Sequence, residues 1–307
     1  MRRRAAIALL VATAAVLIPS NAKAATREFW VGAERVSWNI APNGRDAITG
    51  TTLDPFTTVR TTTVYRRFSK GWRTPEPNQP GADSGGQDFV PGPLLRAREG
   101  DKILVHFKNM EPAGGAAHTM HFHGVHYKPS SDGAYLPGFS GRDGNVMPGQ
   151  NWTYELHAIR DSVGVWPYHD HGTSMDASIE GGLYGMLSIR GKHEKAPDHE
   201  FVTVFAPMGQ FQTINGRAFV GNTPVYKSKI GDRVQWDVMA MGSEHHTFHV
   251  HGHRWRTNGV PEDTKTVGPA ESFRVTWKEN DPGTWLYHCH IESHMAAGMI
   301  GVYQVSK

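Results

Sequence analysis

The amino-acid sequence predicts an all-β protein that consists of two similar antiparallel β-sandwich domains. The chain has 307 residues and is rich in Gly, Pro, Thr, Val and aromatic residues. Short runs that alternate apolar and polar residues are separated by Gly- and Pro-rich turns, and no long stretch keeps a helical period. Several motifs also occur twice in the same order. Together these features are typical of two β-sandwiches related by an internal repeat.

The first 24 residues are predicted to be a secretory signal peptide that is not part of the fold. Three arginines at positions 2–4 precede an apolar run over Ala5–Ile18, and residues 22–24 form an A-x-A cleavage pattern. The adjacent arginines are compatible with twin-arginine export. We therefore expect a secreted protein, either extracellular or periplasmic. No later segment is long and apolar enough to form a membrane anchor.

Seven alternating runs are predicted to be strands, because a period of two places one face of each strand in a core. They are Lys102–Lys108, Trp152–His157, Met186–Arg190, Phe201–Phe205, Arg233–Val238, Ser272–Trp277 and Gly301–Val305. Two regions, Gly71–Pro93 and Lys128–Gly149, are predicted to be long loops. The charged, Pro-containing segment 191–199 is the predicted linker between a first domain over 25–190 and a second domain over 200–307.

Three pairs of segments carry the internal repeat, with offsets of 128, 119 and 131 positions. They are HTMHFHG (118–124) with HTFHVHG (246–252), GVWPYHDHG (164–172) with GTWLYHCHI (283–291), and EGDKILVHF (99–107) with IGDRVQWDV (230–238). The order is kept while the loops differ in length, as expected of two diverged copies of one domain.

The segment YHCHIESHMAAGM at 287–299 contains the only cysteine of the chain, Cys289. His294 follows it by five residues and Met299 by ten. A thiolate, an imidazole and a distant thioether are ligands of a blue-copper electron-transfer site. Because side chains alternate faces along a strand, His288 and His290 are expected to point away from Cys289. We therefore predict two metal sites back to back, joined through the covalent bonds of one residue.

The first copy of the repeat lacks this cysteine. Asp170 stands at the position of Cys289, and Met175 and Glu180 stand where the histidine and methionine ligands would be. His118 is kept at its repeat position. Because an aspartate does not supply the soft thiolate of a blue-copper site, we predict that the first domain holds no blue copper.

Ten histidines form four clusters, each with an H-x-H pair. They are His121 and His123; His169 and His171; His246, His249 and His251; and His288, His290 and His294. Within a pair both side chains lie on one strand face, with Cα atoms about 6.5 Å apart, which suits binding to one cluster of ions. The pairs offer eight imidazoles, more than one four-coordinate zinc uses, and zinc has no redox use for a thiolate–thioether site.

The charge balance and the cysteine count bound the remaining possibilities. Without residues 1–24, which hold four basic and no acidic residues, the chain keeps 28 basic and 29 acidic residues. It shows no basic stripe of the kind that indicates a nucleic-acid partner. A single cysteine forms no disulfide within its own chain, and its histidine neighbours indicate a metal ligand.

The motifs HFHG, YHDHG, HTFHVHG and YHCHIESHMAAGM resemble the signature of multicopper oxidases, over both predicted domains. The length, with the cysteine motif only in the second domain, is similar to that of the bacterial two-domain (small) laccases. The resemblance implies Greek-key cupredoxin domains and four coppers per active unit: one type 1, one type 2 and a type 3 pair. It also implies a homotrimer with the three-copper cluster between neighbouring subunits, and tandem domains can close such a ring by head-to-tail contacts.

The resemblance further implies a copper for each ligand position. For the type 1 copper the implied ligands are His246, Cys289 and His294, with Met299 as the axial ligand. For the type 2 copper they are His121 and His249. For the type 3 pair they are His123, His169, His171, His251, His288 and His290.

Three further residues match positions near the copper cluster of small laccases. Tyr127, in HFHGVHY, is implied as a redox participant beside the type 2 copper. Asp132, in SSDG, is the first candidate for proton delivery, and Asp263 either shares that role or orients a ligand histidine. Glu244 and His245 stand where small laccases are expected to have tyrosines, so the donor pocket is expected to differ.

We therefore hypothesise a laccase-type oxidase that takes single electrons from phenols or aromatic amines and reduces O2 to water. The electrons enter through His294 or His246 and cross from Cys289 through His288 and His290. Three alternatives stay open. One is an oxidase of cuprous or ferrous ions, and another is a copper nitrite reductase, which would carry its blue-copper cysteine in the first domain. The third is a non-catalytic copper carrier or electron-transfer protein.

Overall fold

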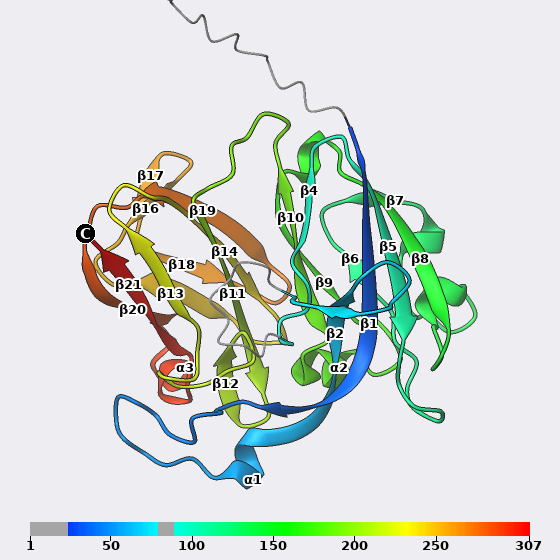
Figure 1. Cartoon of the computed structure of the whole chain (residues 1–307), viewed down its shortest axis with the longest axis horizontal. Helices are drawn as coiled ribbons and strands as arrows, with labels where there is room; N and C mark the ends of the chain where they lie inside the picture. The colour runs from blue at the N-terminus through cyan, green and yellow to red at the C-terminus, as the bar shows by residue number, and fades with distance from the viewer. Residues whose placement is uncertain (1–23, 79–88) are drawn as a thin grey trace, which may run out of the picture.

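The computed structural model describes residues 24–78 and 89–307, and regular structure in this part of the chain is almost entirely β. Figure 1 shows two groups of strands side by side, one from each half of the chain. The predicted signal peptide covers residues 1–24, which lie outside the described residues apart from Ala24. Among the described helices, none has the length and apolar character needed to cross a membrane.

The strands before residue 191 form two sheets. One has six strands in the order β3-β2-β1-β5-β8-β7, and the other has four in the order β4-β10-β9-β6. The bounds are β1 Thr26–Asn39, β2 Val59–Phe68, β3 Pro75–Glu76, β4 Leu95–Arg98, β5 Lys102–Asn109, β6 His121–Phe122, β7 His126–Tyr127, β8 Asn151–His157, β9 Gly164–His169 and β10 Tyr184–Arg190.

The strands after residue 198 form two larger sheets and one two-stranded sheet. Their orders are β12-β11-β14-β19, β13-β21-β20-β15-β18 and β16-β17. The bounds are β11 His199–Met208, β12 Phe211–Ile214, β13 Val225–Lys229, β14 Arg233–Ala240, β15 His246–Val250, β16 Trp255–Thr257, β17 Val260–Glu262, β18 Thr264–Val267, β19 Ser272–Lys278, β20 Gly283–Cys289 and β21 Ile300–Ser306. In the described chain, each sheet takes its strands from one side of the segment 191–198 only.

The helices are short and lie at the ends of strands. They are α1 Pro55–Thr58, α2 Met175–Gly181 and α3 Glu292–Ala296, with 3-10 turns η1 Pro129–Ser131, η2 Arg142–Gly144 and η3 Arg160–Ser162. Helices α2 and α3 hold equivalent places in the repeat, because each follows the H-x-H pair of β9 or β20. In both halves a short helix therefore follows shortly after the H-x-H pair.

All seven predicted strands are confirmed, as β5, β8, β10, β11, β14, β19 and β21. The long strand β1 was not predicted, because charged residues interrupt its alternation; pairing with β2 on one side and β5 on the other holds it in place. The expectation of purely antiparallel sheets is wrong. Parallel pairs join β1 to β5, β4 to β10, β11 to β14 and β13 to β21, because crossovers bring strands distant in sequence together.

Buried hydrophobic side chains form three clusters. One fills the sandwich of the first half and one that of the second half, where it includes Cys289 and Met299. The third takes side chains from both halves, among them Trp38, Met186 and Met239. The two halves are therefore joined by a hydrophobic interior and not only by the connecting segment.

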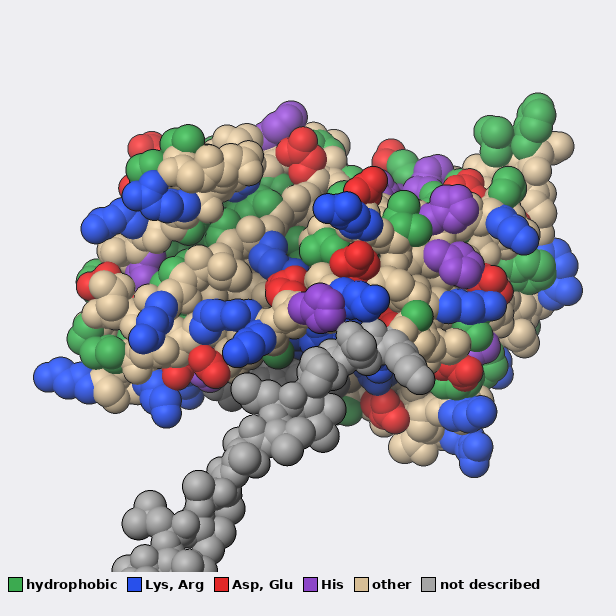
Figure 2. Space-filling model, turned by 90° about the horizontal axis from the view of Figure 1, so that it is seen from above, with side chains coloured by type: hydrophobic (Ala, Val, Ile, Leu, Met, Phe, Trp, Pro, Cys, Tyr) green, Lys and Arg blue, Asp and Glu red, His purple; other side chains and the backbone are tan. Residues whose placement is uncertain are grey.

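The surface carries charges of both signs. On the face drawn in Figure 2, basic and acidic side chains are interspersed, and histidines lie at several places between them. This face therefore has no extended field of one sign, in agreement with the near-neutral balance of the sequence after residue 24.

Candidate functional site

Three elements of the second half bring one thiol and two imidazoles together. His246 begins β15, Cys289 ends β20, and His294 lies in α3. Cys289 Sγ lies 3.8 Å from Nδ1 of His246 and 3.7 Å from Nδ1 of His294, and the two Nδ1 atoms are 3.1 Å apart. We call these three residues the Cys289 site. Their donor atoms converge on one point, the arrangement that a small metal ion needs.

The Cys289 site is buried on one side and reaches the surface on the other. His246 is fully buried, whereas the side chain of His294 is 14% exposed. Burial, followed by the neighbouring His294 and His245, lowers the pKa of His246 to about 3, so its imidazole is neutral at pH 7. Met299 is buried in the same core cluster, and its carbonyl accepts a hydrogen bond from the Cys289 amide at 3.2 Å.

On the other side of β20 lies the second histidine set, which consists of His249, His251, His288 and His290. Nε2 of His251 lies 3.1 Å from Nε2 of His288, and the ring centroids of His249 and His290 are 5.3 Å apart. Nδ1 of His288 donates to the carbonyl of Cys289 at 2.9 Å. The strand ends at Cys289 and His290 follows it directly, so the predicted back-to-back arrangement of thiol and imidazoles is present.

The first half contains a matching group, the first histidine set: His121, His123, His169 and His171. Nε2 of His123 lies 3.2 Å from Nε2 of His169, and the centroids of His121 and His171 are 5.2 Å apart. These distances match those of the second set within about 0.1 Å. The two sets are therefore two copies of one constellation, each built on the ends of equivalent strands.

Backbone carbonyls orient the imidazoles of both sets. Nδ1 of His121 donates to the carbonyl of Asp132 at 2.7 Å, and Nδ1 of His249 donates to the carbonyl of Asp263 at 2.7 Å. Nδ1 of His169 likewise donates to the carbonyl of Asp170 at 2.9 Å. Because Nδ1 holds the proton, Nε2 keeps its lone pair and is free to bind a metal.

The electrostatics of the first set also suit metal binding. Burial, and then the neighbouring His121 and His171, lower the pKa of His123 to about 4. Burial lowers the pKa of His169 to about 4 as well, against a hydrogen bond to the Asp170 carbonyl that raises it. Both imidazoles are therefore neutral at pH 7, the form in which histidine is a ligand.

Tyr127, Asp132 and Asp263 are placed differently from one another. Tyr127 packs edge-on to the ring of His121, with centroids 6.3 Å apart. Burial, then the charge of Asp132 and a hydrogen bond to it, raise the pKa of Tyr127 to about 12, and Oδ1 of Asp132 lies 3.5 Å from Nδ1 of His121. Asp263 is exposed and contacts His249 through its backbone carbonyl. The carboxylate near the ligands is therefore that of Asp132.

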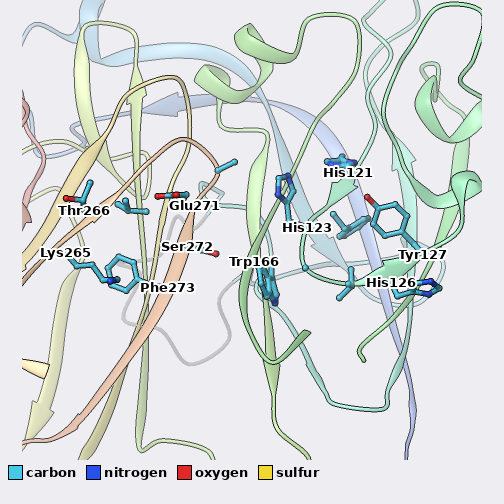
Figure 3. A pocket seen from close by; sticks show the side chains of 15 residues that line it. His121, His123, His126, Tyr127, Trp166, Lys265, Thr266, Glu271, Ser272 and Phe273 are labelled. Carbon is cyan, nitrogen blue, oxygen red and sulfur yellow. The ribbon is translucent and has the colours of Figure 1, made fainter. Parts of the chain in front are cut away.

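A cavity of about 730 Å³ opens beside the first histidine set. His121, His123 and Tyr127 lie on one side of it, and Thr266 and Phe273 from the second half lie on the other, as Figure 3 shows. Within the described residues, no ring contact joins a histidine of the first set to one of the second. In the described part of one chain, the cavity beside the first set is therefore not lined by histidines of the second set.

Sequence reasoning singled out Glu244 and His245 but not their partners. Oε2 of Glu244 lies 3.7 Å from Nε2 of His294, and Gln212 donates to the same oxygen at 2.6 Å. The side chain of Glu244 is 45% exposed. A negative charge therefore stands at the outer edge of the Cys289 site. The contact with Gln212 joins segments far apart in the sequence, so no local pattern signals it.

Two family models, both described as multicopper oxidase, match residues 75–194 and 192–307. Hephaestin from Homo sapiens is 30% identical over 358 residues, which cover 94% of this chain and 30% of hephaestin. The chain thus spans about 30% of the length of the curated relatives that it matches first. The matched residues include every histidine of both sets and the whole Cys289 site.

Two solved structures share the architecture. A crystal structure of a multicopper oxidase matches with a TM-score of 0.69 and 24% identity, over 92% of this chain and 89% of that one. A copper nitrite reductase from Nitrosomonas europaea matches with a TM-score of 0.69 and 17% identity, over 92% of this chain and 94% of that one. At such identities the likeness shows a common fold, an all-β pair of cupredoxin-like domains, and does not separate one chemistry from the other.

Proposed function

Since the chain belongs to the multicopper oxidase family, we propose that it takes single electrons from a donor at the Cys289 site and reduces O2 to water at the two histidine sets. One observation carries the proposal: Cys289, whose thiol converges with His246 and His294, is bonded directly to His288 and His290 of the second set. A nitrite reductase with its cysteine in the first domain does not fit, because Asp170 stands there.

The residues present fit copper. A buried thiol with two imidazoles is a soft donor set, and both histidine sets present Nε2 lone pairs held in place by carbonyl acceptors. Copper bound there would supply the one-electron redox chemistry that the proposed reaction needs. We infer that the Cys289 site would hold one type 1 copper, with Met299 as a further ligand, and that the histidine sets would hold three coppers.

The protein supplies a short path between the sites. From Cys289 the covalent backbone leads to His288 in one direction and to His290 in the other. The hydrogen bond from Nδ1 of His288 to the Cys289 carbonyl adds a second connection. Because His246 is fully buried, the electron donor approaches through the exposed edge of His294.

Asp132 and Tyr127 supply proton handling near the first set. Oδ1 of Asp132 lies 3.5 Å from Nδ1 of His121, and the carboxylate accepts a hydrogen bond from Tyr127. A carboxylate at this distance from the ligands can pass protons through one water molecule. We propose Asp132 as the group that passes protons toward the site of O2 reduction. Asp263 orients His249 through its carbonyl.

We propose that the active unit is a homotrimer. Each histidine set offers four imidazoles, and in one chain the two sets do not meet. A head-to-tail ring would place the first set of one subunit against the second set of its neighbour. When three subunits close the ring, every first set has a second set opposite it. Export by the N-terminal signal peptide, and hence a secreted protein, is proposed on the pattern of residues 1–24 alone.

Two donor classes remain candidates, and each has an observation in its favour. Phenols and aromatic amines suit a laccase-type oxidase, which would accept their electrons through the exposed edge of His294. Cuprous or ferrous ions suit a metallo-oxidase, because Glu244 places a carboxylate 3.7 Å from Nε2 of His294. The similarity to Ferroxidase HEPHL1 from Homo sapiens, 29% identical over 91% of this chain, supports the second class.

A copper count combined with an absorption spectrum tests the oxidase. Four coppers per chain, a blue band and a near-ultraviolet shoulder are expected. Oxygen consumption with a phenol, compared with ferrous and cuprous ions at equal concentration, then assigns the donor class. A protein that binds copper but consumes no oxygen with any of these donors would instead be a copper carrier. Reduction of nitrite by the purified protein would favour the copper nitrite reductase over the oxidase.

A further inference from the structure

The first half keeps the frame of the Cys289 site although it lacks the cysteine. Asp170 replaces Cys289 and lies between two ligands of the first set, His169 and His171. The side chain of Asp170 is 1% exposed, and that of its neighbour His118 is 7% exposed. A buried carboxylate and a buried imidazole therefore occupy the place that the second half uses for a metal.

The hydrogen bonds of the two places correspond atom by atom. In the second half, the amide of Thr247 points at Cys289 Sγ at 3.4 Å, and Nδ1 of His246 lies 3.8 Å from the same sulfur. In the first half, the amide of Thr119 donates to Oδ1 of Asp170 at 2.7 Å. Nδ1 of His118 lies 3.1 Å from Oδ2 of Asp170.

The contact distances differ between the Cys289 site and the Asp170–His118 pair. At 3.7 and 3.8 Å, the sulfur–nitrogen contacts of the Cys289 site are long for direct hydrogen bonds and leave room for an ion between the donors. Nδ1 of His118 and Oδ2 of Asp170, 3.1 Å apart, form a direct hydrogen bond that leaves no room for an ion between them. Among the described residues, His118 and Asp170 belong to no converging set of metal donors.

The Asp170–His118 pair has neighbours on two sides: Glu111 lies near His118, and Thr119 connects Asp170 to the backbone of His171. Nε2 of His118 lies 3.7 Å from Oε1 of Glu111, a buried carboxylate that Arg35 and Thr63 also contact. In front, the amide of His171 donates to Oγ1 of Thr119 at 3.1 Å. The hydrogen bonds thus run from His118 through Asp170 and Thr119 to the backbone of His171, while Glu111 lies behind His118 at a distance too long for a hydrogen bond.

From this geometry we infer that the Asp170–His118 pair is a metal-free replacement for a type 1 site, and that its role is to position His169 and His171. The inference rests on the proposed function, because it takes these two histidines as copper ligands. In the second half a bound ion would connect Cys289, at the end of β20, to His246 on the neighbouring strand; in the first half the carboxylate of Asp170 makes the equivalent connection with hydrogen bonds alone. Asp170 is a positioning residue and touches no reacting atom.

The first test uses metal-free protein, so that it does not depend on the proposed function. In Asp170→Ala, the amides of Thr119 and His171 should exchange with deuterium about tenfold faster, because both lose their place in the hydrogen-bonded chain. The segments 246–251 and 287–290 should exchange as in the wild type. Asp46→Ala is the matched control, since that buried aspartate bonds only to its own loop and should leave both amides unchanged. Wild-type exchange at Thr119 and His171 in folded Asp170→Ala would overturn the inference.

The second test uses copper-loaded protein and reads its spectrum. Asp170→Ala should keep the blue band of the Cys289 site and lose the near-ultraviolet shoulder, with fewer coppers per chain. If this variant does not accumulate, His118→Ala carries the second test, because it removes the hydrogen bond from His118 to Asp170 and leaves the bond from the Thr119 amide in place. An unchanged shoulder and copper count in the folded variant would refute the positioning role. A wild-type protein that binds no copper would refute the proposed function, while the exchange result would still decide the inference.

Discussion

Nδ1 of His288 donates a hydrogen bond of 2.9 Å to the carbonyl oxygen of Cys289, the residue whose thiol faces the opposite side of β20. The side chain of Cys289 belongs to one site and its carbonyl orients a ligand of the other. The carbonyl contact does not involve the sulfur. A substitution that removes the sulfur therefore leaves the hydrogen bond that orients His288 in place.

Cys289→Ser should remove the blue absorption and leave the histidine sets able to bind copper, because the carbonyl that orients His288 is retained. Three coppers per chain in place of four, with the type 2 signal still visible by electron paramagnetic resonance, are expected. A surviving blue band would show that the thiolate ligand has been assigned to the wrong residue.

Glu244→Gln should weaken the use of cationic donors. The carboxylate lies 3.7 Å from Nε2 of His294 and is partly exposed, so the lost attraction is worth about 1 kcal/mol, or roughly a fivefold fall in kcat/KM for ferrous ion. A neutral phenol assayed with the same variant serves as the control and should change little. Equal losses for both donors would mean that the substitution damages the site itself.

Gly301→Ala should disturb the ligand strand. A Cβ at Gly301 would lie 2.4 Å from the ring of Tyr287, which is fully buried directly before His288. Overpacking of this kind costs about 1–3 kcal/mol, and the displaced tyrosine should shift the blue band as well. Urea unfolding and absorption measure the two effects. Gly191→Ala is the control, because its Cβ would meet Glu194 only at an ordinary 3.7 Å.

The buried carboxylate of Glu279 should make stability depend on acid pH. Burial alone raises its pKa, but hydrogen bonds from His253, Tyr303 and Trp277 outweigh burial and lower the pKa from 4.5 to about 2. Because the folded pKa lies below the unfolded one, the stabilisation is present above pH 4.5 and is lost as the pH falls toward 2. A shift of this size corresponds to about 3 kcal/mol.

Urea unfolding of metal-free protein at pH 6, 4, 3 and 2 measures this dependence. Glu279→Gln should be less stable than the wild type at pH 6, and the gap should narrow as the pH falls. Glu34→Gln is the control, since Glu34 is a partly exposed partner of Arg66 on the surface. A gap that stays constant down to pH 2 would contradict the low pKa.

Mixing two inactive variants should restore oxidase activity if the histidine sets meet between subunits. One variant carries Ala at the two positions of HFH, 121 and 123, and the other carries Ala at 249 and 251. In co-expressed mixed rings about a quarter of the interfaces combine two intact sets, so roughly a quarter of the wild-type activity is expected. No recovery, in mixtures shown by mass to contain both chains, would place each cluster within a single chain.

Local patterns predicted the strands and the ligand motifs because both depend on residues close in sequence. The alternation of Arg233–Val238 and of Gly301–Val305 is confirmed as β14 and β21, and the spacing around Cys289 placed the thiol and its neighbours on opposite faces. The internal repeat located the second copy of each motif. These patterns can be recognised in a single sequence because side chains along a strand alternate faces with a fixed period of two residues.

Contacts between distant segments were not predictable in the same way. Nothing in the sequence near Glu111 indicates that Arg35 contacts it, or that Glu279 accepts hydrogen bonds from His253 and Tyr303. The parallel pairing of β1 with β5 also depends on how the sheets close, and not on the alternation within either strand. Such contacts depend on how the strands pack across the β-sandwich, and this packing cannot be read from local sequence patterns.

The third hydrophobic cluster, shared by Trp38, Met186 and Met239, has a consequence for how substrates arrive. Side chains of both halves pack together in this cluster, and separating the halves would expose them to water, which opposes a hinge motion between the halves. A donor therefore reaches His294 by diffusion to a surface that already exists, and catalysis needs no opening and closing of domains. Turnover in this chain should then follow the speed of encounter and of electron passage, with mechanical motion of the halves setting no limit.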